Sequence, residues 1–219
     1  MVSYESIKSN EAIRTYISAA DASLSALGYT EHSFAHMTKV AKDVSYILGT
    51  LGFDAHTVEV GMIAGYLHDI GNLVNRTDHS QSGAVMAFRI LDKLDMPPED
   101  IAEVVTAIGN HDEGTGVPVS NIAAALIIAD KSDVRRSRVR NSDVSTFDIH
   151  DRVNYSVTSS GLEISEDKKR ITLSITIDTE ISSVMSYFEI FLGRMLLCRK
   201  AAERLGLEFS LVINDQIQI

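Results

Sequence analysis

The amino-acid sequence predicts a mainly α-helical protein that carries a small α+β segment at its C-terminal end. Over the first two thirds of the chain, apolar residues recur three and four positions apart, the spacing of a buried helix face. After about residue 150, apolar and polar residues alternate, as they do in a half-buried strand. The 219 residues are enough to bury a sizeable core. We therefore expect a helical domain over residues 1–150, with a C-terminal α+β segment over residues 151–219 packed tightly against it.

Six helices are expected in the first part, each ended by residues that favour helix termini. The first carries an apolar face of Ile13, Tyr16, Ile17, Ala20, Leu24 and Leu27 and stops at Gly28. The second is expected to begin near Thr30, a candidate N-cap, and to stop at Gly52. The other four are expected near residues 54–69, 80–94, 98–109 and 120–135, with a proline pair at 97–98 between two of them.

The C-terminal segment is expected to hold about three strands and one long helix. The alternating apolar residues are Val153, Tyr155 and Val157, and then Ile171, Leu173, Ile175 and Ile177. The turn-like sequence SEDKK between these two runs predicts a hairpin. A long helix is expected from about Thr179 to Leu205, before a last strand over residues 207–213.

Composition excludes several classes of protein. The formal net charge of -10 argues against a general nucleic-acid binder, which normally has a basic surface. A single cysteine, Cys198, cannot form an intrachain disulfide. The N-terminal residues lack the basic-then-apolar layout of a signal peptide, and no apolar run approaches the roughly 18 residues of a membrane span. We expect a cytoplasmic protein that does not contact membranes.

Histidines and carboxylates interrupt the apolar runs at the ends of the expected helices. The clearest case is GYLHDIGNLVNRTDH, residues 65–79, in which an apolar run finishes on a histidine and an aspartate. Burying such groups without partners would cost several kcal/mol. The set of polar residues at these positions is His36, His68, Asp69, His79, His111 and Asp130.

This set favours a metal centre over separate buried polar groups. Four histidines and two carboxylates suit Mn²⁺, Fe²⁺/Fe³⁺ or Zn²⁺. Six ligands exceed the number that one closed zinc site uses, so two ions that share a bridging carboxylate are expected. His56 and His150 are interpreted as ordinary hydrogen-bonded histidines. His32 lies four residues before His36 on the same expected helix face and is a candidate substrate contact.

In order, His36, His68-Asp69 and Asp130 resemble the H…HD…D signature of the HD-domain metal-dependent phosphohydrolase superfamily. The resemblance covers roughly residues 30–135, and YLHDIGN followed by IIADKSD is its most specific part. His79 and His111 resemble the additional ligands of the dinuclear branch, which includes cyclic-dinucleotide phosphodiesterases of the HD-GYP type and diadenosine-tetraphosphatase-like proteins. The chain lacks the Gly-Tyr-Pro signature of the HD-GYP type, which weighs against a cyclic dinucleotide as substrate.

The resemblance implies an HD-domain helical bundle that hydrolyses a phosphoester or phosphoanhydride bond of a small phosphorylated metabolite, of the nucleotide class, with a metal-activated water. It implies two divalent ions, Fe or Mn foremost and Zn or Mg as further candidates. Asp69 would bridge the ions, one being held by His36, His68 and Asp130 and the other by His79 and His111. Asp112 and Glu113 are candidates for orienting water or protonating the leaving group, and could equally form a solvated turn.

Several cations are candidate phosphate contacts. Members of the superfamily often carry lysine where this chain has Asn72, and Arg76 is a candidate substitute. The run DKSDVRRSRVRN, residues 130–141, places Lys131 and Arg135 four positions apart, which predicts that both face the pocket from one helix. The alternative is that Arg135 to Arg140 form an exposed run that pairs with surface carboxylates.

Two other functions fit the same residues. A di-iron site on this scaffold could perform oxygen-dependent cleavage, as in a few members of the superfamily. The metal domain could also be a non-enzymatic module that binds metal or ligand. A homodimer formed through an exposed strand edge is left open by the sequence.

Overall fold

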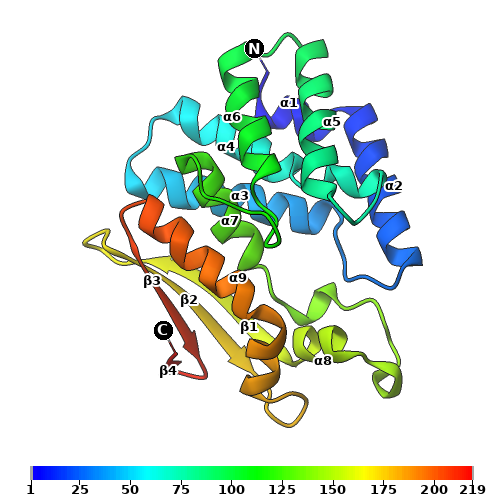
Figure 1. The fold of residues 1–219 in the computed structure, drawn as a ribbon, viewed down its shortest axis with the longest axis vertical. Coiled ribbons are helices and arrows are strands. Elements are labelled where there is room, and N and C mark those ends of the chain that lie inside the picture. Colours follow the sequence, from blue (N-terminus) through cyan, green and yellow to red (C-terminus); the bar gives the residue numbers. More distant parts are fainter. Residues whose placement is uncertain (1, 219) are drawn as a thin grey trace.

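The structure, a computed structural model, describes residues 2–218 (Figure 1). Its helices are α1 (Tyr4–Ser9), α2 (Glu11–Ala26), α3 (Phe34–Leu51), α4 (Ala55–Leu67), α5 (His79–Lys93), α6 (Pro98–Gly109), α7 (Asn121–Lys131), α8 (Ile149–Ser156) and α9 (Val184–Arg204). Three short 3₁₀ helices are η1 (Ile70–Leu73), η2 (Arg136–Arg138) and η3 (Val144–Thr146). The strands are β1 (Val157–Ile164), β2 (Arg170–Ile177), β3 (Glu208–Ile213) and β4 (Gln216–Ile217). The expected class, mainly α with a small α+β segment, is confirmed.

Most helix ends follow local signals. The side chain of Asp54 accepts a hydrogen bond from the Thr57 amide at the start of α4, and Ser120 caps α7 in the same way. Gly52 ends α3 with a φ of 92°, a left-handed conformation that glycine adopts without steric cost. Pro98 occupies the first turn of α6, where its missing amide hydrogen is not needed. The helix α1, before the first expected one, was not predicted.

Two helix ends differ from the prediction because tertiary hydrogen bonds replace helical ones. Thr30 does not begin α3, which starts at Phe34 with Ser33 as its N-cap residue. The amide of His32 donates to Asp21 Oδ1 instead, and the amide of Glu31 donates to the Arg138 carbonyl. At the other site, α7 ends at Lys131 and does not continue to residue 135. His32 and Arg135 therefore lie outside the helices expected to carry them.

The strand expected at residues 153–157 is wrong, because residues 149–156 form α8 and the first strand begins at Val157. Asp148 caps this helix by accepting a hydrogen bond from the Asp151 amide, which favours helix over the strand that the alternation predicted. The long helix α9 begins at Val184, five residues later than expected, after the capping residue Ser183. A short strand that was not expected, β4, lies beside β3 at the edge of the sheet. Residue 150 lies inside α8, and the division of the chain near it stays a prediction.

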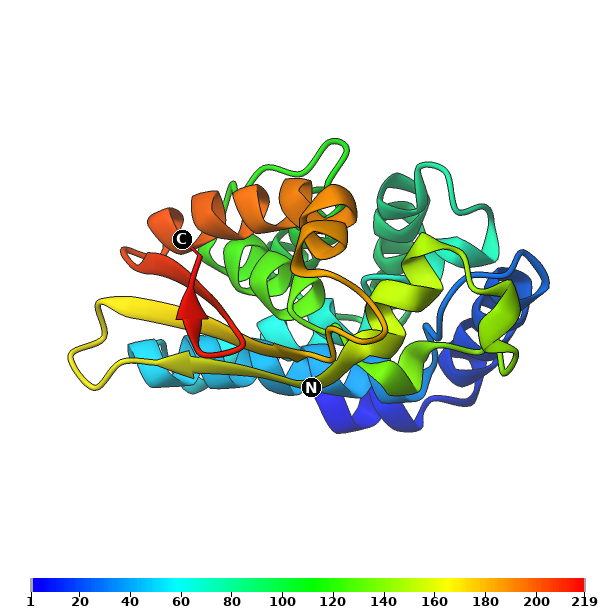
Figure 2. The same ribbon diagram turned by 90° about the horizontal axis from the view of Figure 1, so that it is seen from below.

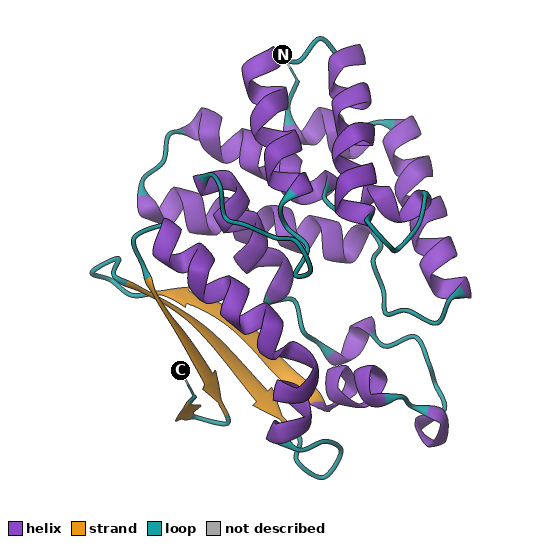
Figure 3. Cartoon of the chain, viewed as in Figure 1, coloured by secondary structure: helices purple, strands orange, loops and turns teal. Residues whose placement is uncertain are grey.

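The four strands form one sheet in the order β1-β2-β3-β4. The first two are the predicted antiparallel hairpin, joined by SEDKK, whereas β2 and β3 are parallel and connected through α9 (Figure 3). The buried residues of β2 alternate as expected: Ile171, Leu173, Ile175 and Ile177. Figure 2 shows α9 lying over the sheet and beside α7, so that this helix faces both parts of the molecule.

The apolar side chains of both parts form one connected core, which extends from Ile7 on α1 to Ile213 on β3. Four apolar residues of α4 (Ile63, Ala64, Tyr66 and Leu67) and most of α7 are fully buried within it. Both of these helices end on polar residues of the expected metal set, so the core holds those residues rigidly. Over residues 2–218, no helix is sufficiently long and apolar to pass through a bilayer.

Candidate metal centre

The ends of five helices converge on one buried point. His36 lies in the first turn of α3, His68 follows α4, and His79 begins α5. His111 follows α6, and Asp130 lies in the last turn of α7. The four histidines and Asp69 are each at most 3% exposed. The structure thus brings together all six residues that the sequence singled out as metal ligands.

The first half of the centre surrounds one oxygen of Asp69. Oδ2 lies 3.2 Å from His68 Nε2 and 3.6 Å from His36 Nε2. Asp130 Oδ1 lies 3.4 Å from His36 Nε2 and 3.6 Å from His68 Nε2. Three ligand atoms, from His36, His68 and Asp130, lie within 4.8 Å of one another and could hold an ion.

The second half surrounds the other oxygen of the same carboxylate. Asp69 Oδ1 lies 3.2 Å from His79 Nε2 and 3.8 Å from His111 Nε2. The two Nε2 atoms are 3.2 Å apart. His68, Asp69 and His111 make a second group that could hold an ion. Asp69 therefore lies between two groups of donors, with one oxygen toward each.

Hydrogen bonds at the far side of each ring orient the four imidazoles. Each Nδ1 lies near an acceptor: Asp133 Oδ2 at 2.7 Å for His36, the Gly65 carbonyl at 2.8 Å for His68, the Arg76 carbonyl at 3.1 Å for His79 and the Ile108 carbonyl at 2.7 Å for His111. These carboxylate and carbonyl oxygens only accept, so Nδ1 carries the proton in each neutral ring and each Nε2 can present its lone pair to an ion. All four lone pairs can then point into the centre.

The charges of the centre also fit a cation. Burial alone would raise the pKa of Asp69, but His68 and hydrogen bonds from His111 and His36 outweigh it and hold that pKa well below its ordinary value. Burial would lower the pKa of His68, yet Asp69 and Asp130 raise it to about 10. Without an ion, protons are thus attracted to the place where a metal would bind. Imidazole and carboxylate donors of this kind suit divalent transition metals.

Asp133 contacts a candidate ligand, and the sequence interpretation missed it. It accepts from His36 Nδ1 and from Arg135 Nε, both at 2.7 Å, and Arg138 Nη1 lies 3.8 Å from it. Burial would raise the pKa of this carboxyl, but the bond from His36 and the charge of Arg138 lower it. Its position three residues after Asp130 was the only signal in the sequence, since its partner His36 is 97 residues away.

A chain of ion pairs connects the metal centre to α9. Lys131 Nζ lies 2.7 Å from Asp130 Oδ2 and 2.6 Å from Glu113 Oε2. The other oxygen of Glu113 accepts from Arg194 Nε at 2.7 Å. Burial would raise the pKa of Glu113, but Lys131 and Arg194 lower it strongly. Glu113, expected to be a general acid or a water-orienting group, is held as a carboxylate between two cations.

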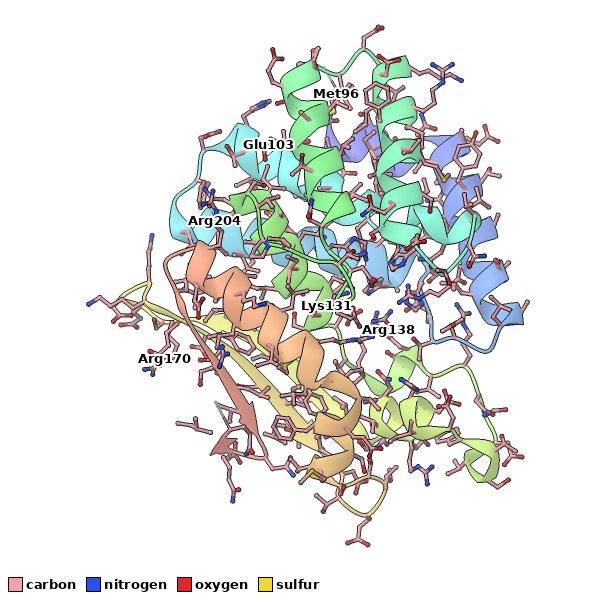
Figure 4. The ribbon with its side chains drawn as sticks, viewed as in Figure 1. Met96, Glu103, Lys131, Arg138, Arg170 and Arg204 are labelled. Atoms are coloured by element: carbon pink, nitrogen blue, oxygen red, sulfur yellow. The ribbon has the colours of Figure 1, made fainter. Side chains whose placement is uncertain are left out.

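A pocket of about 450 Å³ opens onto the centre. Its wall includes the ligands Asp69, His79 and Asp130 and the expected contacts His32, Arg76 and Lys131. Lys131 and Arg138 lie near each other in the middle of the molecule (Figure 4), whereas Arg170 and Arg204 lie at its edge. The lining also includes Tyr29, Asn154, Phe191 and Arg194.

Some expected contacts lie elsewhere. Arg135 does not line this pocket, because α7 has ended before it and its guanidinium pairs with Asp133 and Glu31; Arg138 lines the wall instead. Asn72 is buried, and its side-chain amide donates to the Asp69 carbonyl at 2.9 Å. It therefore supports the backbone of the ligand Asp69.

Other histidines and carboxylates near the site lie as follows. Asp112 Oδ1 lies 3.9 Å from His79 Nε2. His32 is buried with its ring 5.6 Å from that of His36, although it is not on α3. His56 pairs with Asp100 at the surface, as an ordinary histidine would, whereas His150 lies at the pocket.

Known proteins resemble this chain as follows. Residues 33–140 match the family model for the HD domain. The uncharacterized protein MJ1020 of Methanocaldococcus jannaschii is 25% identical over 211 residues, which cover 85% of this chain and 79% of that protein. A solved structure of a predicted HD superfamily hydrolase from an uncultured Thermotogales bacterium is 24% identical, with a TM-score of 0.45 over 60% of this chain and 73% of that one. The matched residues include all five helices whose ends converge and all six candidate ligands, and they identify this part of the chain as an HD domain.

Proposed function

We propose that this chain is a metal-dependent phosphohydrolase that cleaves a phosphoester or phosphoanhydride bond of a small phosphorylated metabolite of the nucleotide class. The observation that carries the proposal is the division of the ligands between the two oxygens of Asp69. His68 and His36 face Oδ2, and His79 and His111 face Oδ1. A carboxylate with imidazole donors on both sides suits a pair of divalent ions.

Two divalent ions, Fe or Mn foremost with Zn or Mg as alternatives, would supply Lewis acidity toward phosphoryl oxygens and a water that is acidic enough to ionise near neutral pH. His36, His68 and Asp130 would hold one ion, and His79 and His111 the other, with Asp69 shared. Lys131 fixes the second oxygen of Asp130, so that Oδ1 faces the centre. We assign the orientation of water to Asp112, because Glu113 is already engaged by two cations.

The pocket supports a small anionic substrate. Its volume, about 450 Å³, lies in the range of small-molecule sites. Arg76 lines it with Nη1 4.0 Å from Asp69 Oδ1, beside the position that a phosphoryl group would take between the ions. Guanidinium groups bind phosphate through paired hydrogen bonds, so Arg76 can serve in place of the lysine that Asn72 replaces.

The first test is metal content, measured by inductively coupled plasma mass spectrometry on protein purified without a histidine tag or chelator. We expect about two ions of Fe, Mn or Zn per chain and their loss in Asp69→Ala. Asp100→Ala, which removes a carboxylate that pairs with a surface histidine, is the control and should keep both ions. A chain without metal even after reconstitution would overturn the proposal.

The second test is phosphate release from a panel of nucleotides and sugar phosphates, with and without oxygen. The proposal expects metal-dependent release that is equal under both conditions. Turnover only in the presence of oxygen and iron would support the oxygenase alternative instead. Full metal occupancy without turnover of any panel member would favour a binding module.

A further inference from the structure

The C-terminal helix α9 brings an arginine to the metal pocket from outside the segment that matches the HD domain. Arg194 lines the pocket together with the ligands Asp69 and Asp130. Its side chain is 25% exposed, so it is not part of the core. No periodicity or motif in the sequence distinguishes it from the other arginines of α9.

Arg194 is held rigidly at two points. Its Nε donates to Glu113 Oε1 at 2.7 Å, and its guanidinium carbon lies 4.5 Å from the centroid of the Phe191 ring. Among residues 2–218, neither of its terminal amino groups has a hydrogen-bond or ion-pair partner. The guanidinium is therefore fixed in place while two of its donor groups remain available.

The other cations of the pocket are more fully engaged. Lys131 is 4% exposed and pairs with both Asp130 and Glu113. Arg138 donates to the Glu31 carbonyl and to the Asp133 carbonyl. Arg76 uses Nη1 toward Asn72 Oδ1 and His79 Nε2, both at 3.4 Å, whereas both terminal amino groups of Arg194 remain available.

We propose that Arg194 binds the anionic phosphate group of the substrate, with Glu113 as the residue that positions it. This inference deepens the proposed function and rests on it. The Glu113 carboxylate holds Lys131 with one oxygen and Arg194 with the other, so the guanidinium is three short contacts away from the ligand Asp130. The free Nη groups then supply the forked pair of donors that suits phosphate oxygens. The C-terminal α+β segment becomes a part of the substrate site.

The test measures binding of inorganic phosphate to the full-length, Mn²⁺-loaded protein by isothermal titration calorimetry, with metal content determined in parallel. Arg194→Met should weaken phosphate binding by roughly tenfold to a hundredfold, the loss expected for hydrogen bonds to a charged group. Metal content should not change. Arg194→Lys should recover only part of the affinity, because an ammonium group cannot make the forked contact. Arg199→Met, an exposed arginine of the same helix that does not line the pocket, is the matched control and should bind phosphate like the wild type.

The outcomes separate this inference from the proposed function. Phosphate affinity that is unchanged in Arg194→Met, in a protein that still hydrolyses a phosphorylated substrate, would overturn the inference alone. Full recovery by lysine, or a loss of metal in parallel with the loss of phosphate affinity, would show that Arg194 only supports Glu113 and would also overturn it. If phosphate binding depends on Arg194 but the protein hydrolyses no substrate, the result would support the inference and overturn the proposed hydrolase function.

Discussion

Asp133 offers the sharpest test of how this centre is built, because it touches a ligand without being one. Its Oδ2 accepts from His36 Nδ1 at 2.7 Å and thereby fixes the ring so that Nε2 faces Asp69 and Asp130. In Asp133→Asn the amide keeps the shape of the side chain but loses its negative charge. The variant therefore weakens the orientation of His36 without removing any metal ligand.

The expected loss follows from this contact and from the cations around it. Removing the outer partner of a histidine ligand typically costs tenfold to a hundredfold in metal affinity, or about 1.4 to 2.7 kcal/mol. The buried Arg138 also loses its counterion, although it keeps its bonds to two backbone carbonyls. Breaking a buried pair costs about 3 to 5 kcal/mol, and those remaining bonds place the loss of unfolding free energy near 3 kcal/mol.

The stability difference should depend on pH through both Asp133 and His36. The pKa of Asp133 is lowered in the folded protein, so the stabilisation it provides is complete above the unfolded value of 3.8 and is lost as pH falls through the lower folded pKa. The difference in unfolding free energy between wild type and Asp133→Asn should be greatest between about pH 5 and 6 and shrink below about pH 4. It should also shrink as pH rises through the folded pKa of His36, which the hydrogen bond to Asp133 helps to raise.

Two assays check these values. Competition with a fluorescent chelator gives the affinity of each ion, and urea unfolding in EDTA gives the stability of the metal-free chain. Asp100→Asn is the matched control, since Asp100 contacts His56 at 2.8 Å but at the surface. The reasoning fails if Asp133→Asn binds both ions as tightly as wild type, or if the Asp100 variant shows the same loss.

Two further perturbations test other parts of the site. Because the pKa of His68 is raised to about 10 in the metal-free protein, its ring is positively charged at pH 7.5. Metal binding should therefore release about one proton per centre, which calorimetry in buffers of different ionisation enthalpy measures. Metal binding without proton release would contradict this expectation. In Gly71→Ala, the new Cβ would lie under 3.0 Å from the His79 carbonyl and the Gly83 nitrogen, so we expect a loss of at least about 3 kcal/mol in urea unfolding. Gly49→Ala, whose Cβ meets nothing within 4 Å in a helix, should instead gain about 0.5 to 1 kcal/mol, and equal effects in both variants would refute the close-contact argument.

The sequence alone predicted that the apolar run ending on His68 and Asp69 carries these two residues into a buried polar centre. Helical periodicity placed the run on a helix, and the residue types at its end were ones that need partners. The same reasoning located His36, His79, His111 and Asp130 at helix ends. These inferences succeeded because the residue types are given by the sequence itself, and because helix ends depend on residues close together in the chain.

Errors arose where contacts outside the pattern used for the prediction decided the backbone. Arg135 was expected to share a helix face with Lys131, but the chain leaves α7 at Lys131 and turns Asp133 toward His36. The alternation at residues 153–157 was overruled by the cap that Asp148 provides to α8. In each case the local pattern is compatible with more than one backbone conformation. Contacts with residues outside the pattern decided which conformation forms.

By itself, the sequence determined that the protein is mainly helical, which residue types form a metal centre, and which family signature they follow. Only the tertiary structure decided how the ligands divide between the two oxygens of Asp69, that Asp133 orients His36, and that Arg194 reaches the pocket. The contact between Asp133 and His36 joins residues 97 positions apart, and the contact between Arg194 and Glu113 joins residues 81 positions apart. Pairings over such separations depend on how helices pack, and packing is a property of the whole core that no short stretch of sequence carries.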